Sequence, residues 1–337
     1  MKEVPFLLLL KAVTLRRLWN AATALAGFAV SALRKRPVAW GRPFILTLEP
    51  TNVCNLRCPL CITGNGRLTR PTGFMPFERF RTLIDEVGDH LFYLLLYQQG
   101  EPFLHPEFLR FVEYAKRKRI FVTTSTNGHY LDRDTARGTV ASGLDSLIVS
   151  VDGADQDTYA RYRVRGRLQT VLQGIERLAR EKARQKSRTP VIYLQFILMR
   201  HNEHQIDEMK RLAQACGADR FLQKTAYVET PEEARTWLPR RDDLRRYRVA
   251  DGQLLLKRRG RGPCPRPWTS ALINWDGTVG PCCFDKNARY PLGRHDPTPL
   301  HRIWEDDAYT RFRTQMLTNR DRLDICANCT QGLRLFV

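Results

Sequence analysis

The segment Cys54-Asn55-Leu56-Arg57-Cys58-Pro59-Leu60-Cys61 carries three thiols within eight residues, and the interpretation of the chain starts from it. Thiolates hold iron–sulfur clusters, and a four-iron cluster with three cysteine ligands keeps one iron free of the protein. An open coordination position is typical of catalytic metal centres, whereas structural sites are closed. The preceding residues 44–50, FILTLEP, predict a strand that Pro50 ends, so the cysteines lie in the following loop.

The stretch 49–61, EPTNVCNLRCPLC, resembles the first-strand loop of radical S-adenosylmethionine (SAM) enzymes. The resemblance implies that Cys54, Cys58 and Cys61 hold a [4Fe-4S] cluster and that SAM binds its free iron. One electron from the cluster then cleaves SAM to methionine and a 5′-deoxyadenosyl radical. Leu60 stands where the family usually has an aromatic residue. The alternatives are a disulfide or a zinc knuckle, although zinc sites favour Cys-x2-Cys pairs and four closed ligands.

Composition narrows the setting in which the chain works. Hydrophobic residues make up 43% of the 337 positions, which is enough for a sizeable core. Nine cysteines are too few for a disulfide scaffold, and their clustering predicts metal binding in a reducing, cytoplasmic compartment. The formal net charge of +20 favours anionic partners, such as a phosphorylated or lipid-linked substrate. No recognisable nucleic-acid-binding module is present, which argues against nucleic acid.

Residues 1–42 form a basic, apolar extension that we expect to be helical. No uncharged run in it reaches the roughly 20 residues needed to span a bilayer. A basic, apolar helix can instead lie in a membrane interface, which predicts peripheral membrane contact through residues 4–36. The alternative is a helix or helix pair that packs on the rest of the fold or mediates dimerisation.

Strands and helices are expected to alternate from residue 43 to residue 227. A helical period over 77–87 follows the cysteine loop, and short apolar runs at 92–97, 120–126, 146–153, 191–199 and 219–224 predict strands. Six strand-then-helix units make a parallel sheet with right-handed crossovers. The expected fold class is α/β, an open partial (β/α)6 TIM-like barrel, which the family resemblance also implies.

Polar residues follow several of these strands, where the ligand loops of such a barrel gather. Gln99-Gly100-Glu101-Pro102 resembles the Gly-Gly-Glu-Pro segment with which the family holds the SAM amino group, with Gln99 in place of the first glycine. Family members also bind SAM through polar side chains at the ends of the third and fourth strands. The resemblance therefore implies SAM contacts at seven residues: Gly100, Glu101, Pro102, Ser125, Asn127, Ser150 and Asp152. Ser and Asp at strand ends also make turns, which is the alternative for the last two.

A second group of cysteines occupies the C-terminal part of the chain. It comprises Cys264, Cys282, Cys283, Cys326 and Cys329, with a hairpin expected over 271–279 around Asp276-Gly277. The spacing resembles the SPASM/twitch extension of radical SAM enzymes, which carries auxiliary clusters. Five cysteines suit one auxiliary [4Fe-4S] cluster better than two. The expected ligands are Cys264, Cys282, Cys326 and Cys329, with Cys283 as the competitor of Cys282 and a zinc ribbon as the alternative.

These observations predict four segments: the extension 1–42, a radical SAM core at 43–227, a linker at 228–262 and an auxiliary-cluster domain at 263–337. The main functional hypothesis is SAM-dependent hydrogen abstraction that oxidises or epimerises a sugar, aminocyclitol or lipid-linked small molecule. Flavodoxin or ferredoxin would supply electrons. The alternative is maturation of a ribosomally synthesised peptide, which residues 1–42 disfavour because they are too short for a winged-helix recognition domain. A second alternative is a non-catalytic metal-binding scaffold. The sequence identifies no catalytic acid or base.

Overall fold

The computed structural model describes residues 6–257, 262–327 and 329, with side chains from Leu8 onward. These residues form two compact units that interleave along the chain. Unit 1 comprises residues 1–53, 69–122 and 259–337, and unit 2 comprises residues 54–68 and 123–258. The cysteine loop thus belongs to unit 2, although the strand before it belongs to unit 1. The domain boundaries expected at residues 43, 228 and 263 stay predictions.

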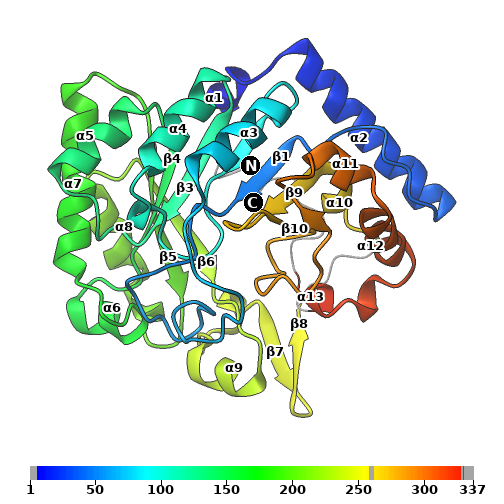
Figure 1. Ribbon diagram of the computed structural model, residues 1–337. Helices are drawn as coiled ribbons and strands as arrows, with labels where there is room; N and C mark the ends of the chain where they lie inside the picture. Colours follow the sequence, from blue (N-terminus) through cyan, green and yellow to red (C-terminus); the bar gives the residue numbers. More distant parts are fainter. Residues whose placement is uncertain (1–5, 258–261, 328, 330–337) are drawn as a thin grey trace. The chain divides into compact units, whose positions relative to one another are not determined.

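Five strands of unit 1 pair in the order β11-β10-β9-β1-β2 (Figure 1). They are β1 (Ile45–Leu48), β2 (Tyr93–Leu95), β9 (Ser270–Ile273), β10 (Thr278–Gly280) and β11 (Gly293–Arg294). β1 pairs in parallel with β2 on one side and with β9 on the other. β9 and β10 form the expected hairpin, in which Gly277 has a φ of +90° that suits glycine. The C-terminal part of the chain therefore extends the sheet that the first strand begins.

After the N-terminal extension, the helices of unit 1 bury apolar residues. They are α3 (Phe77–Val87), α4 (Phe108–Arg117), α10 (Arg266–Thr269), α11 (Leu300–Glu305), α12 (Asp307–Thr318) and α13 (Asp324–Ala327), with short 3-10 turns at Pro102–Leu104 and Arg320–Arg322. Phe80 of α3 stacks on Phe111 of α4 with ring centroids 4.3 Å apart. This aromatic contact joins the two helices that follow the first two strands.

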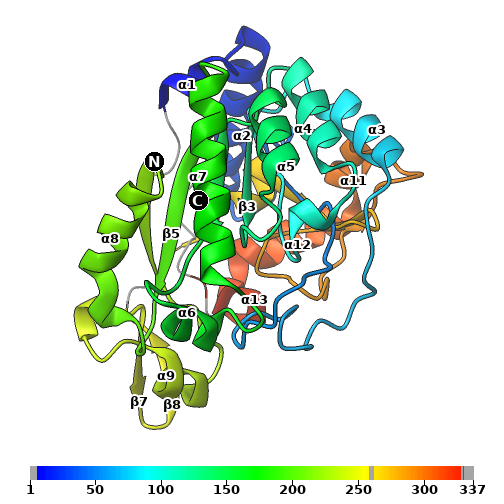
Figure 2. The same cartoon turned by 90° about the vertical axis from the view of Figure 1, so that its left-hand side faces the viewer.

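Unit 2 continues the alternation of strands and helices, with parallel pairing from β3 to β6. β3 (Phe121–Thr126) begins in unit 1, and β4 (Ser146–Ser150), β5 (Val191–Leu198) and β6 (Arg220–Thr225) follow in sequence order. The intervening helices are α5 (Arg133–Ala141), α6 (Gln156–Tyr162), α7 (Leu168–Arg184) and α8 (Ile206–Ala215), the last after a 3-10 turn at Glu203–Gln205. α7 packs against α5, as Figure 2 shows. This regular order is that of the α/β class predicted from the sequence.

The segment 228–262 is predicted to be a linker, but its residues 228–257 form regular secondary structure. They form α9 (Pro231–Trp237), a 3-10 turn at Asp242–Leu244 and a hairpin of β7 (Tyr247–Ala250) and β8 (Gln253–Leu256). The hairpin turns at Asp251-Gly252, both with positive φ, which is a two-residue turn signal that the sequence interpretation overlooked. α9 and the hairpin pack in one apolar cluster with the cysteine loop.

The N-terminal extension forms α1 (Phe6–Leu10) and α2 (Leu15–Arg34), and it packs on unit 1. Arg17 is buried and donates to four backbone carbonyls, those of Ala12, Gly88, Lys118 and Arg119, at 2.6–2.9 Å. Leu8, Leu9, Ala12 and Ala24 join an apolar cluster with residues of β1 and β2. The extension is therefore a helix pair whose inner side packs on the rest of unit 1. This is one of the two alternatives that the sequence left open.

Glu86, near the end of α3, holds the start of α11. Its carboxylate accepts from the backbone N–H groups of Leu300 at 2.9 Å and His301 at 2.8 Å. Burial by itself raises the pKa of Glu86, but hydrogen bonds from His295, from His301 and from those N–H groups outweigh it and lower the pKa to about 2. A carboxyl group whose folded pKa is lowered stabilises the fold above its unfolded pKa.

We expect Glu86→Gln to lose roughly 2–3 kcal/mol of unfolding free energy at neutral pH. The difference from wild type should be fully present above the unfolded pKa of 4.5 and should vanish as the pH falls towards 2. Urea unfolding across that range measures it. Glu78→Gln, on the exposed side of the same helix, is the control. A difference that does not depend on pH would contradict the assignment.

Candidate functional site

The cysteine loop of unit 2 is held by backbone contacts. Cys58 is buried, whereas Cys54 and Cys61 are half-buried. The amide of Arg57 donates to Val164 O at 3.1 Å, and the amide of Cys61 donates to Cys58 O at 3.1 Å. Gly64 lies so close to this turn that a Cβ there would stand 2.5 Å from the nitrogen of Cys58. The loop thus has a defined backbone that presents three thiols in one apolar cluster.

Asn127, directly after β3, contacts the beginning of this loop. Its Nδ2 donates to Asn55 Oδ1 at 2.7 Å and lies 4.0 Å from Cys54 Sγ. Its Oδ1 accepts from the backbone N–H of His129 at 3.1 Å. The structure therefore brings this predicted site residue to the cysteine loop, where its amide links the end of β3 to Asn55.

Asp152, after β4, is fully buried, and both of its carboxylate oxygens have protein partners. Oδ2 accepts from Arg163 Nε at 2.6 Å, and Oδ1 accepts from the backbone N–H of Ile197 at 2.7 Å. Burial raises the pKa of Asp152, and the Arg163 guanidinium and that N–H oppose the rise. The carboxylate thus orients Arg163, and the predicted contact of Asp152 with SAM stays a prediction.

Arg163 connects this carboxylate to the cysteines. Its side chain is only 12% exposed, and its Nη1 lies 3.8 Å from Cys58 Sγ. Burial raises the pKa of the Cys58 thiol, while the nearby positive charge of Arg163 lowers it. A cation beside a ligating thiolate compensates charge that burial would otherwise penalise. Arg163 is one of four arginines between residues 161 and 167, and no local pattern in the sequence distinguishes it from the other three.

The remaining predicted SAM contacts divide between the units. In unit 2, Ser125 is half-buried in β3, and Ser150 ends β4 with its Oγ 3.5 Å from Gln195 Nε2. In unit 1, Gly100 has a φ of +74°, and a Cβ there would lie 2.6 Å from Thr51 O. The next residue, Glu101, is buried; its amide donates to Val53 O, and its carboxylate accepts from Phe103 N within the turn that Pro102 begins. Position 100 requires glycine because its backbone lies close to that of Thr51 and Asn52.

The second group of cysteines lies in unit 1 around Arg266. Cys264, Cys326 and Cys329 are buried, and Cys282 and Cys283 are half-buried. Arg266 Nη1 donates to Cys283 Sγ at 3.3 Å. A hydrogen bond from the Cys282 thiol, together with Arg266, lowers the pKa of Cys283 although burial opposes it. Cys283 is therefore the better thiolate of the adjacent pair, which keeps it in competition with the expected ligand Cys282.

Two buried donors near these cysteines find no acceptor among the described residues. They are Arg266 Nε and the hydroxyl of Tyr309, whose electrostatic neighbours include Cys282. Buried donors without partners cost free energy unless an additional group accepts from them. Sulfide and thiolate sulfurs of an iron–sulfur cluster accept such hydrogen bonds. The residues around the second group therefore fit a cluster better than a set of free thiols.

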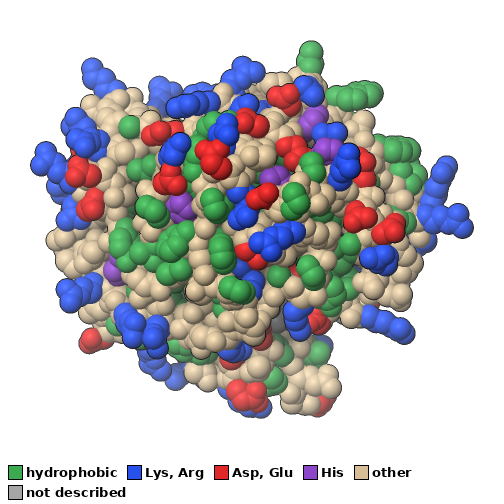
Figure 3. All heavy atoms as spheres, in the orientation of Figure 1, with side chains coloured by type: hydrophobic (Ala, Val, Ile, Leu, Met, Phe, Trp, Pro, Cys, Tyr) green, Lys and Arg blue, Asp and Glu red, His purple; other side chains and the backbone are tan. Residues whose placement is uncertain are grey.

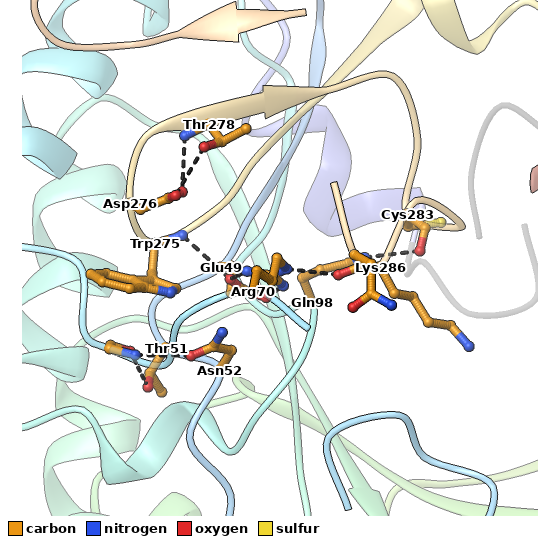
Figure 4. A network of polar contacts seen from close by, with 12 residues as sticks. Glu49, Thr51, Asn52, Arg70, Gln98, Trp275, Asp276, Thr278, Cys283 and Lys286 are labelled. Carbon is orange, nitrogen blue, oxygen red and sulfur yellow. Dashed lines mark hydrogen bonds and ion pairs between the residues drawn. The ribbon is translucent and has the colours of Figure 1, made fainter. Parts of the chain in front are cut away.

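A polar network holds the backbone that carries Cys283 (Figure 4). Arg70 makes a two-pronged ion pair with buried Glu49, at 2.5 and 2.7 Å, and its Nε donates to Lys286 O at 2.7 Å. Gln98 Nε2 donates to Cys283 O at 2.8 Å. Residues after β1 and β2 thus fix the loop of the second group, a connection that no spacing in the sequence indicates.

Within the described part of the chain, no three His, Cys, Asp or Glu side chains converge closely enough to hold a single metal ion.

Family models match both halves of this arrangement. The model of the radical SAM superfamily matches residues 48–213, and that of an iron–sulfur cluster-binding domain, SPASM, matches residues 264–330. The chain belongs to the radical SAM superfamily and carries a SPASM-type domain in its C-terminal part. This confirms the resemblance and the predicted fold class, an α/β partial (β/α)6 barrel with a small iron–sulfur domain.

Three similar proteins illustrate the range of the superfamily. The chain is 28% identical over 176 residues to the mycofactocin maturase MftC of Mycobacterium ulcerans, a match that spans 52% of this chain but only 46% of that protein. It is 24% identical over 317 residues to the tungsten-containing aldehyde ferredoxin oxidoreductase cofactor-modifying protein of Pyrococcus furiosus. This match spans 85% of this chain and 86% of that protein. The fold of Streptococcus suis SuiB, solved with the precursor peptide SuiA, superposes with a TM-score of 0.62 at 14% identity, covering 94% of this chain and 76% of SuiB.

Membership implies [4Fe-4S] clusters and SAM as the cofactors. SuiB has also been solved with SAM bound. The residues present fit these groups. Three thiols in one loop of unit 2 suit the SAM-binding cluster, and the thiols around Arg266, with buried donors that lack an acceptor among the described residues, suit the second. Arg163, Arg266 and the Arg70–Gln98 network are the additions that sequence reasoning missed, because their partners are distant in sequence.

Proposed function

We propose that the chain is a radical SAM enzyme that modifies a peptide. The observation that carries this proposal is the pair of family matches, which coincide with the two cysteine groups. Two of the similar proteins support a peptide substrate. One is a maturase, and another, with the same fold, was solved with a precursor peptide. Oxidation or epimerisation of a sugar, aminocyclitol or lipid-linked molecule, the main hypothesis from the sequence, becomes the second candidate.

The proposed roles of the residues follow from their positions. When bound, the cluster and SAM supply one-electron chemistry for hydrogen abstraction from a carbon. Cys54, Cys58 and Cys61 would ligate the cluster in unit 2, where Arg163 compensates the charge of Cys58 and Asp152 orients Arg163. Gly100, Glu101, Pro102, Ser125, Asn127 and Ser150 are the proposed SAM-binding residues. Cys264, Cys326, Cys329 and either Cys282 or Cys283 would ligate the auxiliary cluster.

The partners and location are also proposals. An electron donor such as flavodoxin or ferredoxin would reduce the clusters. Lys and Arg side chains are distributed over the visible face, with Asp and Glu between them (Figure 3). None of the described helices combines the length and apolar character needed to cross a bilayer. We propose that the protein nevertheless works at a membrane surface.

The decisive experiment is anaerobic reconstitution with iron, sulfide, dithionite and SAM. Formation of 5′-deoxyadenosine is expected in wild type and should be absent in Cys58→Ser. Co-expression with short peptides encoded beside the gene then tests the substrate, read by mass spectrometry as a change in peptide mass that Cys58→Ser abolishes. If sugars or aminocyclitols raise the 5′-deoxyadenosine yield and peptides do not, the second candidate replaces the first. If no 5′-deoxyadenosine forms, the protein is a scaffold.

A further inference from the structure

Helix α2 is amphipathic in the opposite sense to an ordinary surface helix. Its buried positions are Arg17, Asn20, Ala24, Gly27 and Ser31, which are polar or small and recur at helical spacing. A surface helix usually turns an apolar stripe inward and polar residues outward. In α2 the large apolar side chains occur at positions that solvent reaches.

The inward orientation of α2 is fixed by specific bonds. Asn20 exchanges two hydrogen bonds with the backbone of Arg42, at 2.9 and 3.0 Å. Ser31 Oγ accepts from the backbone N–H of Val38 at 2.8 Å and from the indole N–H of Trp268 at 3.1 Å. Together with the four carbonyls bound by Arg17, these contacts would all be lost if the helix rotated. The outward face is therefore a stable property of unit 1.

The outward face is strongly apolar. Leu15, Trp19 and Leu33 of α2 are 87%, 74% and 84% exposed, and Trp40, shortly after the helix, is 61% exposed. Leu18 and Leu25 lie on the same outward side at 48% and 38% exposure. Contiguous apolar patches on a surface mark interaction sites, whereas scattered single residues do not. α2 extends along the outer edge of unit 1 in Figure 1, and its 20 residues span about 30 Å.

Cations surround this face, and acids are missing from the same part of the sequence. Residues 6–48 contain seven Lys and Arg and no Asp or Glu. Arg17 is buried, and the other six side chains are exposed: Lys11, Arg16, Arg34, Lys35, Arg36 and Arg42. Of these, Arg16 pairs with Asp89. An occupant of the face must therefore be apolar at its centre and anionic at its rim.

We propose that the outer face of α2 docks on an anionic lipid bilayer. Leucine and tryptophan side chains enter the interfacial region, where the amphipathic indole ring is favoured, and the flanking cations meet the lipid phosphates. A second copy of the chain fits less well, because its own cations would face these. The inference rests on the membrane location proposed above, and it is independent of the reaction catalysed.

Sedimentation with lipid vesicles tests the docking on the full-length, anaerobically reconstituted protein. Wild type should bind vesicles of equal parts phosphatidylcholine and phosphatidylglycerol and bind phosphatidylcholine vesicles much more weakly. Arg34→Glu, Lys35→Glu, Arg36→Glu together should weaken binding to the anionic vesicles by roughly 100-fold or more. Leu15→Ser with Trp19→Ser should weaken it by roughly 10-fold or more.

Matched controls lie in unit 2. Arg188→Glu, Arg220→Glu, Arg248→Glu together remove the same charge from exposed positions, and Val249→Ser replaces an exposed apolar side chain. Both controls should bind as wild type does apart from a small general effect of net charge. Brominated lipids should quench tryptophan fluorescence in wild type and less so in Trp19→Phe with Trp40→Phe, which keeps an apolar face.

Three results would overturn the proposal: equal binding of wild type and the α2 variants, equal losses in the control variants, or a dimer in sedimentation velocity that Leu15→Ser with Trp19→Ser abolishes while no variant binds vesicles. The last outcome would assign the face to a second copy. Assays of 5′-deoxyadenosine run in parallel report on the proposed reaction, so its failure and the failure of docking are distinguishable.

Discussion

Replacing Arg163 by methionine is expected to lower the free energy of unfolding by about 3–5 kcal/mol. The substitution removes the guanidinium that pairs with Asp152 at 2.6 Å and leaves a fully buried carboxylate with one backbone N–H as its remaining partner among the described contacts. An unpaired buried charge is much costlier than the loss of one exposed ion pair. Urea unfolding of anaerobically prepared protein measures the effect.

The pH dependence separates this mechanism from a simple loss of packing. Burial already raises the pKa of Asp152, and removing Arg163 raises it further. A carboxyl group whose folded pKa is raised destabilises the fold above its unfolded pKa, so the deficit of the variant should shrink as the pH falls from 7 towards 4. Asp152→Asn in the variant should restore part of the loss at pH 7. Arg161→Met, at an exposed position of α6, is the control and should change stability by less than about 0.5 kcal/mol. A deficit that stays constant with pH would contradict the buried-charge explanation.

Serine substitutions in the two cysteine groups are expected to remove different halves of the bound iron. Wild type should hold about eight irons per chain, and Cys58→Ser should retain about four while losing SAM cleavage completely. Cys326→Ser should also retain about four but keep the SAM-binding cluster, visible as an electron paramagnetic resonance signal that SAM perturbs. Cys282→Ser and Cys283→Ser, compared with each other, identify the fourth ligand of the auxiliary cluster.

Cys216→Ser provides the control for these measurements. This thiol is buried at the end of α8 and donates to Ala213 O, away from both groups in the sequence. It should retain all the iron and the full activity. About four irons per chain in wild type, or an unchanged iron content in Cys326→Ser, would contradict the assignment of an auxiliary cluster.

Local patterns predicted the elements of the fold well. The helical period over 77–87 coincides with α3, and each of the six predicted strands between 44 and 224 is present within a few residues. These patterns depend on side-chain periodicity and turn residues, which are properties of short segments. The hairpin at β7 and β8 was overlooked because its Asp251-Gly252 turn lies among charged residues that resemble a linker.

Contacts between distant segments could not be read in this way. The arginine run 161–167 gave no reason to prefer Arg163, since its partner Asp152 becomes buried only when β4 and β5 pair. Likewise, the mean composition of residues 15–34 indicates an amphipathic helix but does not say which side faces inward. That choice is made by Arg17, whose four carbonyl partners belong to segments that include the ends of α3 and α4.

The parallel pairing of β1 with β9 joins positions about 225 residues apart, such as Ile45 and Ser270. A ribosome adds roughly 5–20 residues per second, so one edge of β1 waits about 10–45 s for its neighbour during synthesis. An open strand edge invites pairing with other chains during that interval. The edge of β1 that pairs with β9 therefore stays open to other chains until residues 270–273 have emerged.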